Sequence, residues 1–435
     1  MSARKLAVTL LLQREKTDGY SNLMLDHILE RSELDLRDKR FCSALCYGVL
    51  ERQLTLDHII KKYSKKTPEK LDAAVLQILR VGLYQLLYME QVPDTAAVSE
   101  SVKLTKKFRK ASASGFVNAV LRNFIRDDKK IDYPKNSAAK ASVMYSVPEW
   151  LVKRLFKDLG EDNACEFLKD SFNAPPLTIR RNPLAITEEE LISDLESKGI
   201  EKHRLVPNAY ILKKGGNIRD CKSFKNGGFH VQDIASQLCA AALGAKNDET
   251  ILDLCAAPGG KTFTIAENMN GTGMVYAFDL FEQRAGLIKK GAERLHLENI
   301  SAKQGDASLY NEKLPKADRV LCDVPCSGIG VIRRKPEIRY KSEEELSKLP
   351  ELQWKILQNA AKYVKPGGIL IYSTCTILKE ENEEIAEKFL SSYPDFEPEP
   401  LLPELHDELS SSMKTLLPSF LGSDGFFMAK FRRVK

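Results

Sequence analysis

From about residue 231 onward, short apolar runs alternate with stretches of helical pattern, and this alternation constrains the fold more than any other feature of the chain. Strand, turn and helix repeating in this order predict a mostly parallel sheet with helices on both faces. Ligands of such sheets bind beyond the carboxyl ends of the strands. We therefore expect residues 231–435 to form a Rossmann-like α/β domain. Its expected strands are residues 250–254, 274–278, 300–304, 319–322 and 369–373.

The first third of the chain, residues 1–145, has the pattern of an all-α helical bundle. Residues 67–69 (Thr-Pro-Glu) offer a helix N-cap with proline at the first helical position, and apolar residues recur at helical spacing from Leu71 to Leu87. This part holds 26 Lys and Arg against 17 Asp and Glu. Such an excess attracts phosphates, although a solvated basic surface is an equally common origin.

A small α+β module is predicted between these two parts, at residues 146–230. A polar linker at residues 127–136 precedes it. Strand patterns follow at residues 177–182 and 209–212, and residues 187–190 (Thr-Glu-Glu-Glu) form a capping box. The chain is thus expected to contain three domains, with boundaries near residues 145 and 230.

The nine cysteines predict free thiols and no metal site. No CxxC pair occurs, and the CxxxC spacing of Cys322 and Cys326 lacks a second cluster to complete four zinc ligands. The chain has no uninterrupted run of eighteen apolar residues and no signal-peptide pattern at its start. We therefore expect a cytoplasmic protein that does not bind membranes and keeps its thiols reduced.

A small-residue turn follows the first expected strand of the α/β domain. Its end, Gly260-Lys261-Thr262, resembles a P-loop, but Cys255 stands where that motif requires its first glycine, and no dinucleotide motif is present either. Asp279, at the end of the next strand, is placed to accept hydrogen bonds from ribose hydroxyls. Asp306, after the third strand, suits the exocyclic amine of adenine. These acids suit a cofactor that contains adenosine. Because the chain has no phosphate-binding loop, the pattern favours S-adenosylmethionine over nucleotide cofactors.

Two cysteines follow strands at the same expected edge of the sheet: Cys326, shortly after Asp323, and Cys375. A thiolate that adds to carbon 6 of cytosine makes carbon 5 nucleophilic enough to accept a methyl group. Nearby cations, such as Lys261 or the basic run at residues 333–335, are expected to lower the pKa of a thiol in this position. Spacing alone does not decide which of the two thiols attacks.

These segments resemble the NOL1/NOP2/Sun family of RNA cytosine-C5 methyltransferases over roughly residues 145–435. The bundle is similar to the NusB-like RNA-binding domain of the RsmB branch, which acts on 16S ribosomal RNA of the small subunit. The resemblance implies a Rossmann-like methyltransferase domain with a mostly parallel seven-stranded sheet, and an RRM-like module before it. The matching segments are residues 115–123, 231–237, 253–262, 305–306, 323–331, 334–336, 373–375 and 425–430, with Asp279 and Arg284.

The resemblance also implies roles for individual residues. Cys375 would be the nucleophile, Cys326 would assist release, and Asp323 would contact the cytosine edge, with Lys261 as possible support. The residues implied to line the S-adenosylmethionine site are Cys255, Ala256, Ala257, Pro258, Gly259, Gly260, Lys261, Asp279, Asp306 and Asp323.

Two alternatives remain at this point: a transfer RNA cytosine-C5 methyltransferase, and an RNA-binding scaffold that no longer catalyses. The transfer RNA enzyme would share every catalytic residue with the ribosomal RNA enzyme and would differ only in the RNA that it binds. The second is disfavoured because no motif position is lost. We expect a monomer, and we read the acidic residues 379–384 as the solvated start of a helix without a function of its own.

Overall fold

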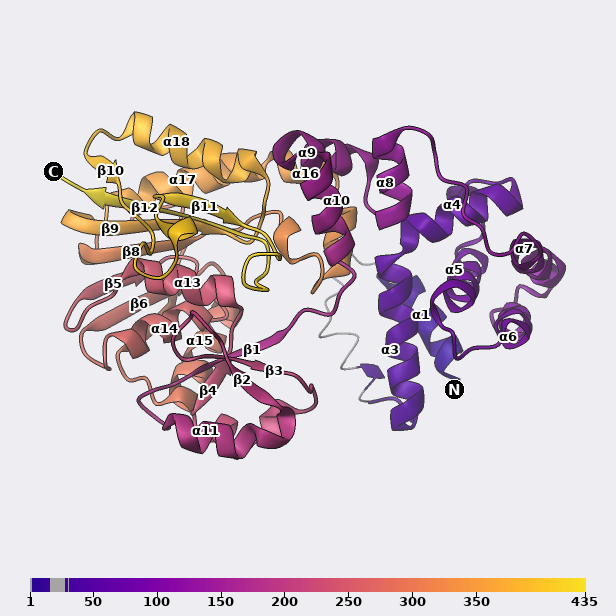
Figure 1. The fold of residues 1–435 in the computed structure, drawn as a ribbon, viewed down its shortest axis with the longest axis horizontal. Coiled ribbons are helices and arrows are strands. Elements are labelled where there is room, and N and C mark those ends of the chain that lie inside the picture. Colours follow the sequence, from indigo (N-terminus) through magenta and orange to yellow (C-terminus); the bar gives the residue numbers. More distant parts are fainter. Residues whose placement is uncertain (1, 16–27, 30) are drawn as a thin grey trace. The chain divides into compact units, whose positions relative to one another are not determined.

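The computed structural model describes residues 2–15, 28–29 and 31–435. The chain divides into two compact units (Figure 1). One contains Met1–Phe172 together with Lys335–Tyr340, and the other contains Asn173–Arg334 and Lys341–Lys435.

The first unit is helical, as the sequence pattern predicts. Helix α5 forms its centre: it packs against α1, α3, α4, α6 and α7, and most of its side chains are buried, including Ile78, Leu79 and Leu83. Amphipathic helices of this kind gain most of their stability from burial of their apolar faces. The helices are α1 (Ala3–Arg14), α3 (Leu36–Glu51), α4 (Gln53–Ser64), α5 (Ala73–Tyr88), α6 (Asp94–Lys107), α7 (Ser114–Arg126), α8 (Ser137–Tyr145), α9 (Glu149–Leu159) and α10 (Glu161–Asp170).

The predicted start of the central helix is wrong. Thr67 precedes only a short 3-10 helix, Pro68–Lys70, and its side chain makes no capping hydrogen bond. The extended backbone of Leu71 then separates this turn from α5, which begins at Ala73. Asp72 is the cap, because its Oδ1 accepts hydrogen bonds from the backbone N–H groups of Ala74 at 3.0 Å and Val75 at 3.3 Å.

A segment from the second half of the chain, Lys335–Tyr340, belongs to the helical unit. Arg339 is fully buried and donates hydrogen bonds to the backbone oxygens of Tyr145 at 3.2 Å and Ser171 at 2.9 Å. The Tyr340 hydroxyl donates to the backbone oxygen of Leu50 at 2.7 Å. A buried guanidinium requires such partners, so this segment has a defined place among the helices.

The second unit begins with a small antiparallel sheet, in the strand order β2-β3-β1-β4. Thr187 and Glu190 form the predicted capping box at the start of α11. The strands predicted here are confirmed, and two short ones join them. The elements are β1 (Leu177–Arg181), α11 (Glu188–Leu195), β2 (Ile200–Lys202), β3 (Ala209–Leu212), α12 (Lys222–Lys225) and β4 (Phe229–Val231).

The larger sheet has the strand order β10-β12-β9-β8-β5-β6-β7, with β11 paired to β12. Strands β5 to β9 run parallel, whereas β12 pairs antiparallel with β9 and β10. The predicted, mostly parallel sheet is therefore confirmed. Its strands are β5 (Thr250–Asp253), β6 (Met274–Asp279), β7 (Ile300–Gln304), β8 (Ala317–Asp323), β9 (Val364–Thr374), β10 (Phe396–Pro398), β11 (Met413–Leu416) and β12 (Phe426–Arg433).

Helices cover both faces of this sheet (Figure 1). Alternate residues of β9 face opposite sides: Ile369 and Ile371 belong to one buried cluster, and Leu370 and Tyr372 belong to the other. This period of two is what a strand covered on both faces requires. One cluster includes α13 (Ile234–Leu243), α14 (Gly260–Asn268) and α15 (Glu282–Leu295); the other includes α17 (Leu349–Ala361) and α18 (Glu383–Ser392), and α16 (Glu343–Ser347) precedes α17.

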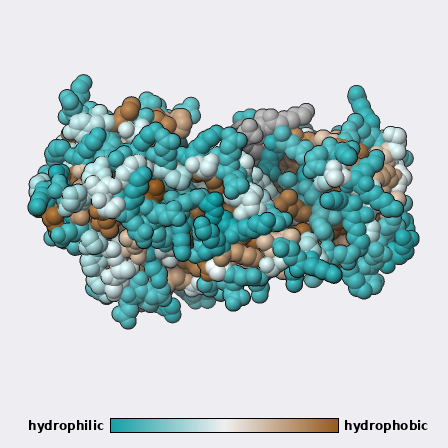
Figure 2. Space-filling model, turned by 90° about the horizontal axis from the view of Figure 1, so that it is seen from above, coloured by the Kyte–Doolittle hydropathy of each residue, from teal (hydrophilic) through white to brown (hydrophobic). Residues whose placement is uncertain are grey.

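None of the helices that the structure describes is long and apolar enough to cross a membrane. Hydrophilic side chains cover most of the face shown in Figure 2, where the hydrophobic areas are small and scattered.

The capping of α5 can be tested by substitution. Asp72→Ala removes the acceptor for two backbone N–H groups and should lower the free energy of unfolding by about 1 kcal/mol in urea titrations. Asp72→Asn keeps the acceptor and loses only the exposed ion pair with Lys110, so it should lower the free energy of unfolding by less than Asp72→Ala does. Thr67→Ala should have almost no effect. Equal losses for Thr67→Ala and Asp72→Ala would contradict this assignment.

Candidate active site

Two thiols meet where strands β8 and β9 end. The two strands are parallel neighbours, and Asp323 on β8 stands opposite Ser373 on β9. Cys326 and Cys375 follow these residues, and their Sγ atoms are 3.0 Å apart. The backbone N–H of Cys375 also donates to the Cys326 sulfur at 3.3 Å. Both cysteines are free thiols, so the structure brings together the pair that the strand ends predict.

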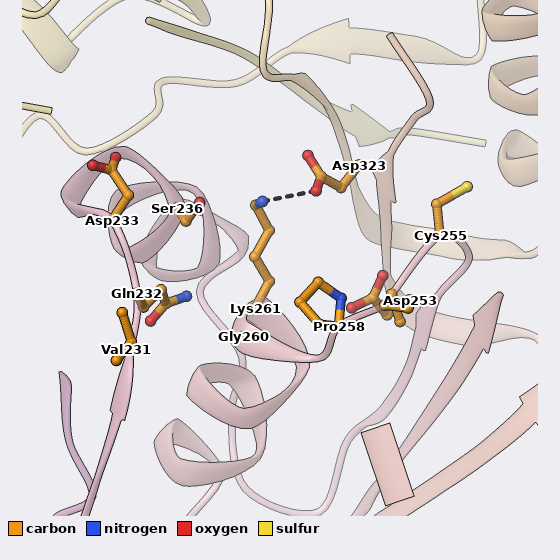
Figure 3. Close-up of a pocket in the computed structure, with 12 residues that line it drawn as sticks. Val231, Gln232, Asp233, Ser236, Asp253, Cys255, Pro258, Gly260, Lys261 and Asp323 are labelled. Carbon is orange, nitrogen blue, oxygen red and sulfur yellow. Dashed lines mark hydrogen bonds and ion pairs between the residues drawn. The ribbon is translucent and has the colours of Figure 1, made fainter. Parts of the chain in front are cut away.

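Asp323 lies beside this pair and is held in place from two sides. Its Oδ1 accepts a hydrogen bond from the Ser373 hydroxyl at 2.9 Å, and its Oδ2 accepts one from the Lys261 ammonium at 2.8 Å (Figure 3). Burial alone would lower the pKa of Lys261, but the charge of Asp323 and the nearby thiols of Cys239 and Cys375 raise it above its usual value. Lys261 therefore stays protonated and provides a fixed positive charge next to the thiols.

The expectation that nearby cations lower the pKa of a thiol in this position is wrong for Cys326. Its hydrogen bond with Cys375 and its burial raise the pKa of Cys326 well above the usual value. The arginines of the basic run have other partners: Arg333 Nε donates to Asp424 Oδ1 at 2.8 Å, and Arg334 Nε donates to Asp424 Oδ2 at 2.6 Å. Arg334 also pairs with Asp233 at 3.1 Å, so two carboxylates balance the charges of the two arginines, and neither arginine offsets the effects that raise the pKa of Cys326.

The turn after β5 lines a cavity of about 200 Å³ (Figure 3). Gly259, with φ of 112°, ends the turn and leads into α14. Only glycine adopts this conformation without strain. Ten residues were expected at the cofactor site, and seven of them line this cavity. They are Cys255, Ala256, Ala257, Pro258, Gly260, Lys261 and Asp323; the other lining residues are Val231, Gln232, Asp233, Ser236 and Asp253.

Asp279 and Asp306 lie at the ends of β6 and after β7. Asp279 is almost fully buried, accepts a hydrogen bond from the Phe281 N–H at 3.2 Å and pairs with Arg284 at 3.4 Å. Asp306 accepts hydrogen bonds from Ser308 and lines a second, smaller cavity together with Phe278. Both acids thus also form hydrogen bonds within their own turns, and Asp306 faces the smaller cavity.

Comparison with known proteins identifies the family. Three family models match: the NusB family over residues 1–126, the ferredoxin-like domain of the RsmF/B-like methyltransferases over residues 147–219, and the 16S rRNA methyltransferase RsmB/F family over residues 240–432. The probable ribosomal RNA small subunit methyltransferase B of Bacillus subtilis is 37% identical over 446 residues, which cover 99% of each chain. That of a Synechocystis species is 36% identical over all of both chains. The chain belongs to the RsmB-type 16S rRNA methyltransferase family.

Solved structures share the fold of this RsmB-type chain. The crystal structure of PH0851 matches with a TM-score of 0.82 at 27% identity, covering 100% of this chain and 99% of that one. A methyltransferase homolog from Pyrococcus horikoshii matches with a TM-score of 0.61 at 27% identity and covers 69% of this chain. Residues 1–126 of the helical unit are accordingly a NusB domain, and the second unit contains an S-adenosylmethionine-dependent methyltransferase.

The residues of the RsmB-type site fit this cofactor. S-adenosylmethionine carries a cationic sulfonium and an ammonium group, and the main cavity contains the carboxylates of Asp253 and Asp323. The glycines of the turn allow a ligand to approach the backbone at the start of α14. The smaller cavity, with Asp306 and Phe278, has the polar and aromatic groups that adenine requires.

Sequence reasoning missed the residues that hold the loop of Cys326. Glu381 is fully buried, so our reading of residues 379–384 as wholly solvated is wrong. Its Oε2 accepts hydrogen bonds from the Ser327 N–H at 2.9 Å and from Gln353 Nε2 at 2.8 Å. Gln353 Nε2 also donates to the backbone oxygen of Pro325 at 3.1 Å. Asn382, the next residue, is fully buried as well, and the contact of Glu381 with a loop 54 residues earlier in the chain leaves no signal in the local sequence.

Two glycines, which sequence reasoning also left without a role, bring the loop close to β9. The Gly330 N–H donates to the backbone oxygen of Cys375 at 3.1 Å, and the Gly425 N–H donates to the backbone oxygen of Gly330 at 2.9 Å. A Cβ atom on Gly330 would lie 2.0 Å from the oxygen of Gly425. No other residue fits at this position without moving the backbone of the thiol pair.

Asp253 should make the stability of the protein depend on pH. Burial raises its pKa to about 7, so between about pH 4 and pH 7 the folded protein retains a proton that the unfolded chain has lost. Stability therefore falls as pH rises through this range, and Asp253→Asn should remove that fall. The variant should be more stable than the parent above pH 7, by about 2–4 kcal/mol, and lose this advantage toward pH 4.

Urea unfolding between pH 5.5 and 8 measures this difference. Asp318→Asn is the control, since Lys365 holds the pKa of Asp318 below its usual value against the opposing effect of burial. Its stability difference from the parent should be constant over this range. A constant difference for Asp253→Asn would show that Asp253 is ionised throughout.

Proposed function

We propose that this RsmB-type enzyme methylates carbon 5 of a cytosine in 16S ribosomal RNA through a covalent cysteine adduct at carbon 6. One observation carries the proposal: two free thiols lie 3.0 Å apart beside a carboxylate, at the sheet edge that holds the cofactor loop. Methylation of a nucleobase amine needs no thiol, whereas methylation of cytosine carbon 5 requires a nucleophile at carbon 6.

Cys375 is the proposed nucleophile. Because the pKa of Cys326 is raised, its proton stays on that sulfur and can be donated toward the sulfur of Cys375. Lys261 adds a positive charge nearby. Both effects favour the thiolate at Cys375, which supports the order of attack that the family resemblance implies.

In the proposed reaction, the Cys375 thiolate adds to carbon 6 and the electron pair of the 5,6 double bond moves toward carbon 5. Asp323 contacts the cytosine edge, and Lys261 and Ser373 keep its carboxylate oriented. S-adenosylmethionine supplies the methyl group that carbon 5 accepts. Cys326 then gives its proton to the departing Cys375 sulfur and, as the thiolate so formed, takes the proton of carbon 5. The bond between Cys375 and carbon 6 breaks, the double bond between carbons 5 and 6 forms again, and both cysteines end as thiols.

Substitution of each thiol separates these roles. Cys375→Ala should abolish methyl transfer and adduct formation, whereas Cys326→Ala should accumulate an RNA-protein adduct because release is blocked. Denaturing gels with and without ribonuclease, and transfer of a tritiated methyl group, measure the two outcomes. Cys322→Ala is the control, since Cys322 is a buried packing residue of β8. An adduct that survives Cys375→Ala would reverse the assignment.

The RNA substrate is proposed from the NusB domain, whose part of the chain holds the excess of basic residues. We propose cytoplasmic action by a single chain, since α14, β8 and β9 of one chain supply Lys261, Asp323 and Ser373.

Bisulfite sequencing of total RNA from cells with and without this protein tests the substrate. A single 5-methylcytosine of 16S ribosomal RNA should disappear. Loss confined to transfer RNA would instead support the transfer RNA enzyme. If the pure protein fails to bind S-adenosylmethionine in calorimetry, the non-catalytic scaffold would be favoured over both.

A further inference from the structure

Gln232, which has no role so far, is held rigidly at the wall of the main cavity. It lies between β4 and α13 and is only 6% exposed. Its backbone N–H donates to the Thr178 oxygen at 3.2 Å, and its backbone oxygen accepts from the Thr178 hydroxyl at 2.8 Å. These two bonds with β1 fix the backbone from which the Gln232 side chain extends.

The side-chain amide of Gln232 has one satisfied end and one unsatisfied end. Its Oε1 accepts a hydrogen bond from Thr264 Oγ1 at 2.7 Å and lies 3.2 Å from His230 Nε2. Its Nε2 is buried and has no hydrogen-bond partner among the residues that the structure describes. In Figure 3 this nitrogen lies on the side of Gly260 and Lys261. Buried donors are rarely left unpaired, so a bound molecule is expected to supply the acceptor.

The other residues that line the cavity indicate which part of a bound molecule lies beside the Gln232 amide. Asp253 and Asp323 line it on the side away from Gln232, whereas Gln232, the Ser236 hydroxyl and the N-terminus of α14 at Gly260 supply donors (Figure 3). A third acid, Asp233, lies on the side of Gln232, but its carboxylate already pairs with Arg334 at 3.1 Å and accepts a hydrogen bond from the Asp424 N–H at 3.2 Å. A group with an ammonium and a carboxylate matches acids on one side and donors on the other. The thiols Cys326 and Cys375 do not line this cavity, so the target cytosine is not its occupant.

We propose that the Gln232 amide donates a hydrogen bond to the carboxylate at the amino-acid end of S-adenosylmethionine, with the Ser236 hydroxyl as a second donor. The adenosine end then extends toward Asp279 and the smaller cavity at Asp306. Thr264 is a positioning residue, because its hydroxyl holds the oxygen of the amide and so turns the nitrogen toward the cavity. This assignment rests on the cofactor of the family and is independent of the chemistry at cytosine.

The test compares two ligands that differ only in the carboxylate: S-adenosylhomocysteine and its decarboxylated analogue, which keeps the amine. Calorimetry with the full-length protein gives their dissociation constants without any turnover. Gln232→Met removes the donor at similar volume and should weaken S-adenosylhomocysteine about tenfold or more, the usual effect of losing a hydrogen bond to a charged group. Binding of the decarboxylated analogue should change less than about twofold. Ser236→Ala should show the same selectivity to a smaller extent.

Gln304→Met is the matched control at the adenosine end, where Gln304 lines the smaller cavity. It should affect both ligands alike. If Gln232→Met also weakens both ligands alike, the amide has only a structural role. If Gln232→Met leaves the dissociation constants of both ligands unchanged and raises the KM for RNA, Gln232 contacts the RNA substrate instead. Gln232→Glu should repel the carboxylate, and tighter binding of S-adenosylhomocysteine by this variant would show that an acceptor faces the ligand and would overturn the proposal.

Discussion

The reversal of strand order at β5 is the constraint on which the site depends. β5 lies between β6 and β8, so the chain leaves the sheet in opposite directions on the two sides of this strand. Connections that diverge in this way leave a crevice at the carboxyl ends of the strands. The turn after β5 and the acids that follow β6 and β7 lie on one side of it, and the two thiols lie on the other. One topological feature therefore brings a cofactor loop and a pair of nucleophiles together.

The register of β8 and β9 then determines how closely the thiols approach. Asp323 stands opposite Ser373, so the chain needs only three further residues on one strand and two on the other to bring the sulfurs within 3.0 Å. A shift by one residue would turn every side chain of a strand to the other face and separate them. Glu381 and the Gly330–Gly425 backbone contact resist such a shift, because they join the loop of Cys326 to the segments that flank β9 and β12.

Much of this arrangement could be predicted from the sequence, because it depends on local pattern. Apolar runs of period two and the residues that follow them identify the strands, the cofactor turn and both thiols. What could not be predicted depends on contacts between distant segments: Glu381 with Ser327, and Arg333 with Asp424. The cap of α5 was misplaced for a different reason. Thr67 and Asp72 both have suitable side chains, and only the extended backbone of Leu71 decides between them.

The charges of the cavity favour the reactant over the product. Asp233, Asp253 and Asp323 line it with a single lysine; Arg334 pairs with Asp233, and burial makes ionisation of Asp253 costly. The sulfonium of S-adenosylmethionine adds a positive charge that offsets this cost, whereas the thioether that remains after methyl transfer is neutral. Coulombic attraction between groups within a buried cavity is stronger than in water, so the loss of one charge weakens the interaction considerably. Methyl transfer itself thus reduces the attraction between the cavity and its ligand, which favours exchange of product for reactant before the next turnover.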